Sequence, residues 1–287
     1  MLGVIGGSGF ETFAEFTTVE MLPRETPFGL ASSGFKKVSV QGKEFIFISR
    51  HGAHHEHLPS EINYRANMYA LKTMGVQGIL SFSAVGSLVH ECAPGDLVMP
   101  FQYIDRTKGL RAHSFLGEGL VGHVSLAKPV CEVMAKRSYE ILKTNPPAAG
   151  AFKIHSGQTY LCVEGPYFST KAESLSYRAM GAHIIGMTNF PEYGLAREAG
   201  MAYVPCSFVT DYDCWDDSIP HVTAEEVMRV MKLNNSKAFH VLSTLLKVGP
   251  ELWKGSLAPQ GGLRTGLFMA KEQIPAAKKD LVEVLLS

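Results

Sequence analysis

Residues 202–215, AYVPCSFVTDYDCW, decide the fold. The first part, Ala202–Thr210, is almost wholly apolar, as is typical of a strand covered on both faces. Asp211 and Asp213 follow it, and alternate residues of a strand leave the same face. Two carboxylates in one small space bind a cation or a ligand with several donors, because like charges repel. An aminopurine ring is such a ligand, although both aspartates could also be ordinary turn residues.

Segments of the same strand-like character occur along the whole chain. We expect further strands at Gly3–Ile5, Phe45–Ser49, Gly78–Ala84, Asp96–Phe101, Thr159–Val163 and His183–Gly186. Capping boxes or an N-terminal proline predict helices that start at Thr170, Pro191 and Thr223 and end before Gly181, Gly200 and Gly249. This alternation predicts a single α/β domain over residues 1–287, with a central mixed sheet flanked by helices and a helical tail at about residues 263–287.

Composition excludes several classes of protein. The chain has 287 residues, 46% of them apolar, and a formal net charge of zero, so it can bury a large core and is not biased toward nucleic acid or an anionic membrane. No stretch has the roughly 18 consecutive apolar residues of a membrane span, and Met1–Ile5 leaves no room for a signal segment before Gly6, so we expect a cytoplasmic protein. Five cysteines without a C-x-x-C pair argue against a disulfide framework and a thiolate metal site.

Ligands of α/β folds lie beyond the carboxyl ends of the strands, so binding residues are expected just after each strand. Four such segments combine glycines with hydroxyl, imidazole or guanidinium groups that suit an oxyanion. They are Gly6-Gly7-Ser8-Gly9, Ser49-Arg50-His51-Gly52, Ser81-Phe82-Ser83-Ala84-Val85-Gly86-Ser87 and Gly186-Met187-Thr188-Asn189. Taken alone, each could also be a tight turn, a core segment or a helix cap.

Two other interpretations of these segments are weaker. A metal site at His54, His55 and His57 is one alternative, but H-E-x-x-H is missing and no carboxylate or cysteine is suitably spaced. We therefore interpret these residues as a solvated, flexible loop and expect no metal. The first glycine segment matches neither G-x-G-x-x-G nor the Walker pattern. The acidic pair together with the anion-binding strand ends therefore predicts a site that holds a purine at one end and phosphate at the other.

The chain resembles the trimeric purine nucleoside phosphorylase superfamily along nearly its whole length, and within it the members that act on methylthioadenosine. The matching segments are residues 5–9 (IGGSG), 25–29 (ETPFG), 50–52 (RHG), 63–67 (NYRAN), 83–88 (SAVGSL), 94–96 (PGD), 164–166 (EGP), 186–192 (GMTNFPE) and 210–215 (TDYDCW). So many matches in the same order make the resemblance specific. One departure is Tyr167, where relatives usually have an arginine.

The resemblance implies a role for each matching residue. Phosphate would be bound by Ser8, Arg50, His51, Ser83, Thr188 and the backbone of Ala84. The nucleoside would be bound by Val85, Gly86, Phe168, Ser169, Met187, Asp211 and Asp213, the two aspartates also being catalytic. An apolar pocket for the 5′ substituent would comprise Ala224, Val227, Met228 and, from a neighbouring subunit, His123.

The implied reaction is phosphorolysis of S-methyl-5′-thioadenosine to adenine and 5-methylthioribose 1-phosphate. The resemblance also implies a homotrimer that requires inorganic phosphate as co-substrate, no metal or organic cofactor, and no nucleic-acid or membrane partner. Three alternatives remain: a 6-oxopurine nucleoside phosphorylase, a methylthioinosine phosphorylase, and a Rossmann-type or non-catalytic nucleotide-binding protein. The acidic pair argues against the first two because a 6-oxo edge needs a donor, and the incomplete glycine fingerprint argues against the third.

Overall fold

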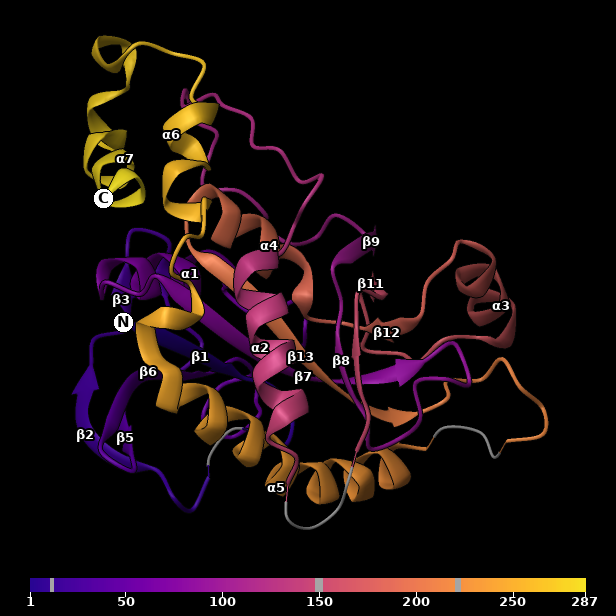
Figure 1. Cartoon of the computed structure of the whole chain (residues 1–287). Helices are drawn as coiled ribbons and strands as arrows, with labels where there is room; N and C mark the ends of the chain where they lie inside the picture. Colours follow the sequence, from indigo (N-terminus) through magenta and orange to yellow (C-terminus); the bar gives the residue numbers. More distant parts are fainter. Residues whose placement is uncertain (11–12, 148–151, 220–222) are drawn as a thin grey trace.

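The computed structural model describes residues 1–10, 13–147, 152–219 and 223–287. Within these ranges an eleven-stranded sheet forms the centre of the molecule (Figure 1). Its main path is β10 (Ile154–Ser156), β8 (Leu97–Met99), β13 (Ala202–Asp211), β7 (Gly78–Ser87), β1 (Leu2–Gly6), β6 (Lys43–Ser49), β5 (Phe35–Val40) and β2 (Thr17–Leu22). A branch from β7 adds β12 (Ile184–Gly186), β11 (Thr159–Val163) and β9 (Gln102–Arg106), and a separate hairpin pairs β3 (Glu25–Thr26) with β4 (Gly29–Leu30).

The sheet is mixed, which confirms the predicted fold class. Strands β6, β1, β7 and β13 are parallel to their neighbours in this central group, whereas β5, β2 and the β12–β7 pair are antiparallel. Each predicted strand is present with small shifts at its ends, since β7 continues to Ser87 and β8 is confined to Leu97–Met99. The prediction missed β2, β3, β4, β5, β9 and β10. The edge strand β2 is almost wholly exposed, and β5 alternates buried with partly exposed residues, so neither has the continuous apolar run of a strand buried on both faces.

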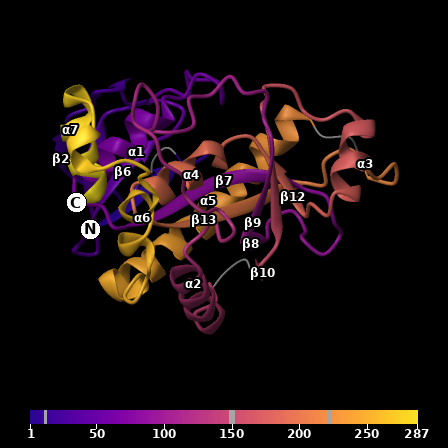
Figure 2. The same ribbon diagram turned by 90° about the horizontal axis from the view of Figure 1, so that it is seen from above.

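Helices cover both faces of the sheet. One face packs against α1 (Tyr64–Thr73), α4 (Asn189–Glu198) and α7 (Lys279–Leu286), and the other against α2 (Glu132–Thr144) and α5 (Ala224–Val248). Successive residues of β1 point to opposite faces of the sheet, so Val4 packs in one core and Ile5 in the other. The helices α3 (Lys171–Ala179) and α6 (Leu263–Gly266) lie toward opposite ends of the molecule (Figure 2).

The three helices predicted from the sequence are present. Thr170 caps α3 in a full capping box with Glu173, and the Thr223 side chain accepts a hydrogen bond from the Glu226 N–H at the start of α5. Helix α4 begins at Asn189, slightly before the predicted Pro191. Among the described residues, the structure shows no helix with the length and apolar character needed to cross a bilayer.

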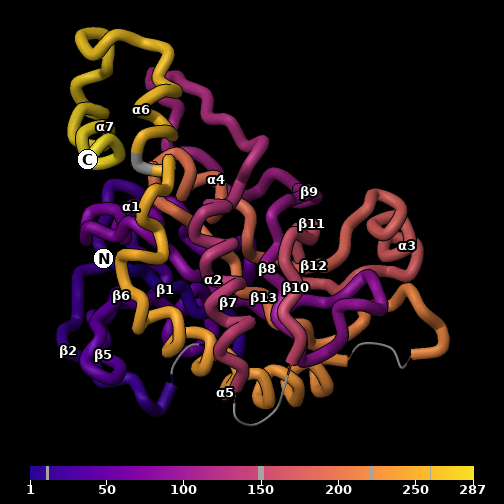
Figure 3. Tube along the Cα trace, viewed as in Figure 1, coloured from indigo at the N-terminus to yellow at the C-terminus, as the bar shows by residue number. Residues whose placement is uncertain are grey.

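The last part of the chain packs beside the segment that connects β9 to α2 (Figure 3). The His123 N–H donates to the Gly266 carbonyl oxygen at 2.8 Å, and the Phe268 N–H donates to the Val121 carbonyl oxygen at 3.1 Å. Residues 263–287 contain α6, two short 3-10 turns and α7. These contacts fix the side of the molecule from which His123 and Phe268 project.

Candidate active site

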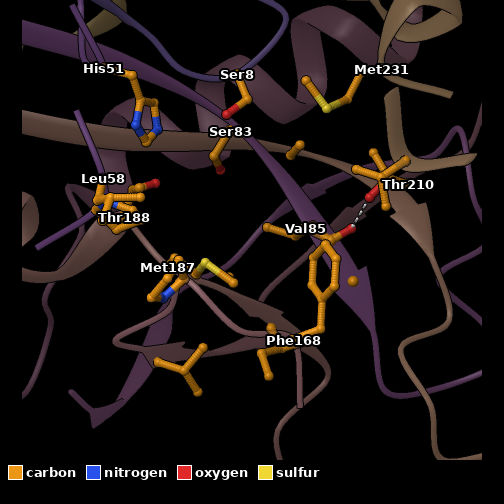
Figure 4. Close-up of a pocket in the computed structure, with 18 of the residues that line it drawn as sticks. Ser8, His51, Leu58, Ser83, Val85, Phe168, Met187, Thr188, Thr210 and Met231 are labelled. Carbon is orange, nitrogen blue, oxygen red and sulfur yellow. Dashed lines mark hydrogen bonds between the residues drawn. The ribbon is translucent and has the colours of Figure 1, made fainter. Parts of the chain in front are cut away.

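A cavity of about 320 Å³ lies at the carboxyl ends of the central strands (Figure 4). The parallel register brings these ends together, because Gly6 of β1 pairs with Ser49 of β6 and Val209 of β13 pairs with Val85 of β7. Most of the predicted site residues line this cavity: Ser8, Arg50, His51, Ser83, Ala84, Val85, Gly86, Phe168, Ser169, Met187, Thr188, Asp211, Asp213 and Val227. Residues distant in the sequence therefore line one cavity.

Ala224, Met228 and His123 are outside the group that lines the cavity. Ala224 and Met228 lie in the exposed first turns of α5, next to the cavity-lining Val227. His123 is exposed, and its ring packs edge-on against Phe268 at 5.1 Å. Within one chain, Val227 therefore lines the cavity. The roles of Ala224, Met228 and His123 in a 5′ pocket remain predictions.

Arg50 is fully buried beside the cavity, and most of its hydrogen bonds are made within the protein. Its Nε and Nη2 donate to the two oxygens of Glu192, at 2.5 and 3.1 Å. A second hydrogen bond from Nη2 reaches Ser81 Oγ at 2.6 Å, and Nη1 donates to the Phe82 carbonyl oxygen at 3.0 Å. The predicted guanidinium fork for phosphate is therefore directed at Glu192. Among the described residues these contacts use four of the five N–H groups, which leaves one N–H of Nη1 for an anion.

The Arg50–Glu192 ion pair is embedded in a hydrogen-bond network. Glu192 also accepts hydrogen bonds from the hydroxyls of Ser81, at 2.7 Å, and Tyr203, at 2.9 Å. Burial alone would lower the pKa of Arg50, but the Glu192 carboxylate outweighs it, so the pKa is raised and the guanidinium stays charged. Gly7 is required here, because a Cβ on it would lie 2.4 Å from Arg50 Nη1.

Small polar groups gather at the same end of the cavity as Arg50. Figure 4 shows Ser8, Ser83, His51 and Thr188 around this end. The Ser83 and Ser207 hydroxyls lie 3.1 Å apart, and His51 Nδ1 lies 2.9 Å from the His57 carbonyl oxygen, so Nδ1 carries the hydrogen of that bond. Donors from several strand ends therefore converge in the manner expected for an oxyanion site.

The loop after His51 is solvated as predicted, since residues 53–56 are exposed, and it has a further role that the sequence did not suggest. His55 and His57 line the cavity, although His55 is exposed. The His55 ring stacks on His51 with centroids 4.4 Å apart, and its Nε2 lies 3.5 Å from Ser8 Oγ. The loop therefore forms one wall of the oxyanion end. Within the described ranges, no group of three or more His, Cys, Asp or Glu side chains could hold a metal ion.

The aspartate pair lies at the other side of the cavity. Asp211 ends β13, and the sheet register shifts between Val209 and Asp211, so that Asp211 pairs with Gly86. Gly86 must lack a side chain, because its Cβ would lie 2.9 Å from Asp211 Oδ1. The Asp213 N–H donates to Asp211 Oδ1 at 2.8 Å, and the Thr210 hydroxyl lies 2.7 Å from Asp211 Oδ2.

The two aspartates converge for a reason other than strand alternation. Asp213 lies beyond β13 and has a φ of 53°, a left-handed conformation that is uncommon for a residue other than glycine. A tight turn closed by the Asp211 carboxylate brings them together. The two carboxylates converge as predicted, but the cause is this turn and not the alternation of side chains along a strand.

Burial changes the chemistry of both carboxyl groups. Desolvation raises the pKa of Asp211, the Thr210 hydroxyl and the Asp213 N–H act against this rise, and the Asp213 carboxylate adds to it. Desolvation likewise raises the pKa of Asp213, against the effect of the Ser174 and Ser169 hydroxyls. Among the residues that the structure describes, Asp213 Oδ2 has no hydrogen-bond partner although it is buried. A ligand with N–H donors would satisfy it.

Between the two ends, the cavity wall is apolar. Met187 and Val85 lie beside Phe168, which is half exposed at the cavity mouth (Figure 4). Gly165, in the turn before Phe168, lies against Met187, since a Cβ on it would be 2.6 Å from the sulfur atom. Tyr167 is 83% exposed and is therefore no part of the inner wall.

Sequence reasoning missed several residues that build the cavity. Thr210, Ile185 and Met231 line it, and Glu192 and Arg111 support it from behind. Met231 lies on α5 one turn after Val227, so helical spacing alone could have placed it on the same face. No sequence signal pairs Arg50 with Glu192, because the two are distant in the chain and meet only through the sheet.

The fold and the cavity define a nucleoside phosphorylase type of protein, and comparison with known proteins agrees. Residues 1–247 match the profile described as "Phosphorylase superfamily". The chain belongs to this superfamily.

Individual relatives carry one name. The S-methyl-5′-thioadenosine phosphorylase of Geobacter sulfurreducens is 40% identical over 287 residues, 100% of this chain and 98% of that protein. The protein of the same name from Thermococcus kodakarensis is 45% identical over 250 residues, 87% of this chain and 93% of that protein. Both names agree with the resemblance found in the sequence.

Solved structures give the same result. The crystal structure of a methylthioadenosine phosphorylase from an antarctic soil metagenomic library is 39% identical, with a TM-score of 0.91 over 100% of this chain and 98% of that one. The Schistosoma mansoni methylthioadenosine phosphorylase in complex with adenine is 34% identical, with a TM-score of 0.81 over 88% of this chain and 93% of that one.

Proposed function

We propose that this protein catalyses phosphorolysis of S-methyl-5′-thioadenosine to adenine and 5-methylthioribose 1-phosphate. The observation that carries the proposal is the buried acceptor pair of Asp211 and Asp213 at one side of a cavity whose other end gathers anion-binding donors. A 6-aminopurine supplies N–H donors to the acceptor side, and phosphate accepts from the other end. The names of the relatives support the same substrate.

At the anion end, the protein positions the nucleophile. The hydroxyls of Ser8, Ser83 and Thr188, the backbone of Ala84, the His51 ring and the Arg50 Nη1 N–H would bind inorganic phosphate. A phosphate oxygen forms the new bond to the anomeric carbon while the bond from that carbon to the purine nitrogen breaks. Because the phosphate is negative, it also stabilises the positive charge that develops on the sugar.

At the base end, the carboxyl groups stabilise the leaving purine. The electron pair of the broken bond moves into the purine ring, and a proton at N7 neutralises it. Because burial raises the pKa of Asp211, this side chain holds or shares such a proton more readily than an exposed aspartate would. Asp213 would accept a hydrogen bond from the base and fix its orientation. Met187 and Phe168 would pack against the ribose and the base.

The proposal also covers the oligomeric state, the co-substrate and the cellular location of the enzyme. We place His123 in the 5′ pocket of a neighbouring subunit of a homotrimer, where Ala224, Val227 and Met228 would complete an apolar surface. The exposed positions of His123 and Phe268 on one side of the chain are compatible with this arrangement. Inorganic phosphate is the co-substrate, no metal or organic cofactor takes part in the proposed steps, and the enzyme acts in the cytoplasm on small molecules.

A substrate panel tests the assignment of the base. Purified protein is assayed with phosphate on methylthioadenosine, adenosine, inosine and methylthioinosine, and the released bases are separated by chromatography. We expect the highest specificity constant for methylthioadenosine, because a 6-oxo group would place an acceptor against the carboxylates. Preference for either 6-oxopurine substrate would overturn the assignment and favour one of the alternative phosphorylases.

A further inference from the structure

Arg111 is a buried cation close to the cavity that the proposed mechanism does not use. It lies on the segment between β9 and α2, is 4% exposed and is absent from the cavity lining. Its Nε donates to Glu164 Oε1 at 2.6 Å. Its Nη1 donates to the carbonyl oxygens of Met187, at 2.7 Å, and Phe190, at 2.6 Å, and its Nη2 donates to the carbonyl oxygen of Glu164 at 3.0 Å.

These acceptors belong to two different walls of the cavity. Met187 follows β12 and lines the cavity, whereas Glu164 follows β11 and precedes the turn that carries Phe168 and Ser169. The two strands are paired up to Cys162 and Gly186, and beyond this ladder the segments meet where Gly165 lies against the Met187 side chain. Arg111 is therefore a direct connection between the ribose-facing wall and the base-facing wall beyond the end of the sheet.

The backbone carbonyl oxygens that Arg111 contacts lie where regular secondary structure is interrupted. The backbone is non-helical at Phe190, with φ −90° and ψ 130°, and the Phe190 and Met187 carbonyl oxygens take hydrogen bonds from Arg111. The second oxygen of Glu164 accepts from the Lys108 N–H at 2.8 Å, which ties the segment of Arg111 to the same wall. Because an arginine offers five donors in a planar fork, lysine cannot reproduce this set of contacts.

We propose that Arg111 is a positioning residue that sets the separation of Met187 from the Phe168–Ser169 turn and thereby the affinity for the nucleoside. The inference rests on the proposed function, since it assigns these two walls to the ribose and the base. Of the residues at the anion end, Ser8, His51 and Ser83 lie on or just after strands other than β11 and β12, and only Thr188 is next to a residue that Arg111 holds. We call the hydrogen bonds from Arg111 to Glu164, Met187 and Phe190 the Arg111 clamp. Loss of this clamp should therefore weaken binding of the nucleoside more than binding of phosphate.

The test compares Arg111→Lys and Arg111→Met with matched variants of Arg137. Arg137 also donates to backbone carbonyls, those of Leu252 at 3.1 Å and Lys254 at 3.2 Å, but it lies on α2 away from the cavity. We expect the KM for methylthioadenosine to rise about tenfold or more in the Arg111 variants, as the loss of charged hydrogen bonds would produce. The KM for phosphate should change by less than about threefold, and the Arg137 variants should keep both constants.

Equal changes in both KM values, or the same pattern in the Arg137 variants, would show a structural role and overturn the proposal. Glu164→Gln keeps the side-chain volume and gives a second, milder test if Arg111→Met does not fold. An unchanged nucleoside KM in a folded Glu164→Gln or Arg111→Lys protein would also refute the proposal.

Calorimetric titration with adenine tests the clamp without turnover. Wild-type protein that binds adenine but releases no base with phosphate would refute the proposed function, whereas an equal adenine Kd in wild type and Arg111→Lys would refute the clamp.

Discussion

The main-chain N–H of Asp213 donates a hydrogen bond to Oδ1 of Asp211 at 2.8 Å. This contact turns the chain at the end of β13 and places both carboxyl groups on one cavity. It also uses one acceptor site of Asp211, and the Thr210 hydroxyl takes another. The base would therefore meet the remaining lone pairs of Asp211 and Oδ2 of Asp213, which has no hydrogen-bond partner in the described part of the chain. We therefore expect the specificity of the site to depend on how many acceptors the pair presents.

Changing Asp211 to asparagine should alter the preference for the 6-substituent. The substitution keeps the shape but replaces one acceptor by a donor, so activity on methylthioadenosine should fall relative to methylthioinosine. Because a mismatched buried polar group costs about 1–3 kcal/mol, the ratio of the two specificity constants should move by about ten- to a hundredfold. Steady-state kinetics on both substrates measure this ratio. An unchanged ratio in a correctly assembled variant would show that Asp211 does not determine specificity.

The same substitution should stabilise the protein at neutral pH. Burial raises the folded-state pKa of Asp211, so the folded state binds more protons than the unfolded state between the two pKa values. The free energy of unfolding therefore falls as pH rises through this window and stays lower above it. Asparagine cannot ionise, and Asp211→Asn should melt at a higher temperature than wild type at neutral pH.

Melting curves recorded over a pH series check this expectation. The advantage of the variant should shrink as the pH falls below the folded-state pKa of Asp211, because wild type then becomes protonated as well. Asp217→Asn, at an exposed aspartate that pairs with Lys171, is the matched control for the loss of one aspartate charge. A variant less stable than wild type at neutral pH would mean that the hydrogen bonds of the charged carboxylate outweigh its burial.

The Arg50–Glu192 pair should show strong energetic coupling. Replacing Arg50 by methionine leaves the Glu192 carboxylate buried without its counter-charge, which typically costs about 3–5 kcal/mol. The double variant Arg50→Met with Glu192→Gln should be less destabilised than Arg50→Met alone, because no unpaired charge remains. Urea unfolding of the wild type, both single variants and the double variant completes the cycle. Additive effects would mean that the pair is not coupled.

The sequence predicted the parts of this site that depend on local pattern. Apolar strands, glycines after them and the pair of aspartates all have short-range signals, and the cavity-lining position of Ser8 or Thr188 followed from its place after a strand. The partner of Arg50 had no such signal, since Glu192 reaches it only through the packing of α4 on the sheet. For the same reason Arg111 passed unnoticed, because its acceptors are backbone carbonyls that any sequence supplies.

Assembly is a further expectation. If His123 enters a neighbouring site, the active protein should sediment as a trimer in analytical ultracentrifugation. His123→Ala should raise the KM for methylthioadenosine while the trimer persists, whereas Tyr167→Ala, at an exposed position beside the inner wall, should change it little. A monomer with full activity at the working concentration would contradict this expectation.

The central claim, that phosphate is the attacking group, is tested most directly by measuring adenine release from methylthioadenosine with and without inorganic phosphate. We predict that release requires phosphate and that adenine and 5-methylthioribose 1-phosphate form in equal amounts, because the bond to the anomeric carbon is made by a phosphate oxygen. Equal release of adenine without phosphate, with free methylthioribose as the other product, would show that water is the nucleophile and would contradict the claim.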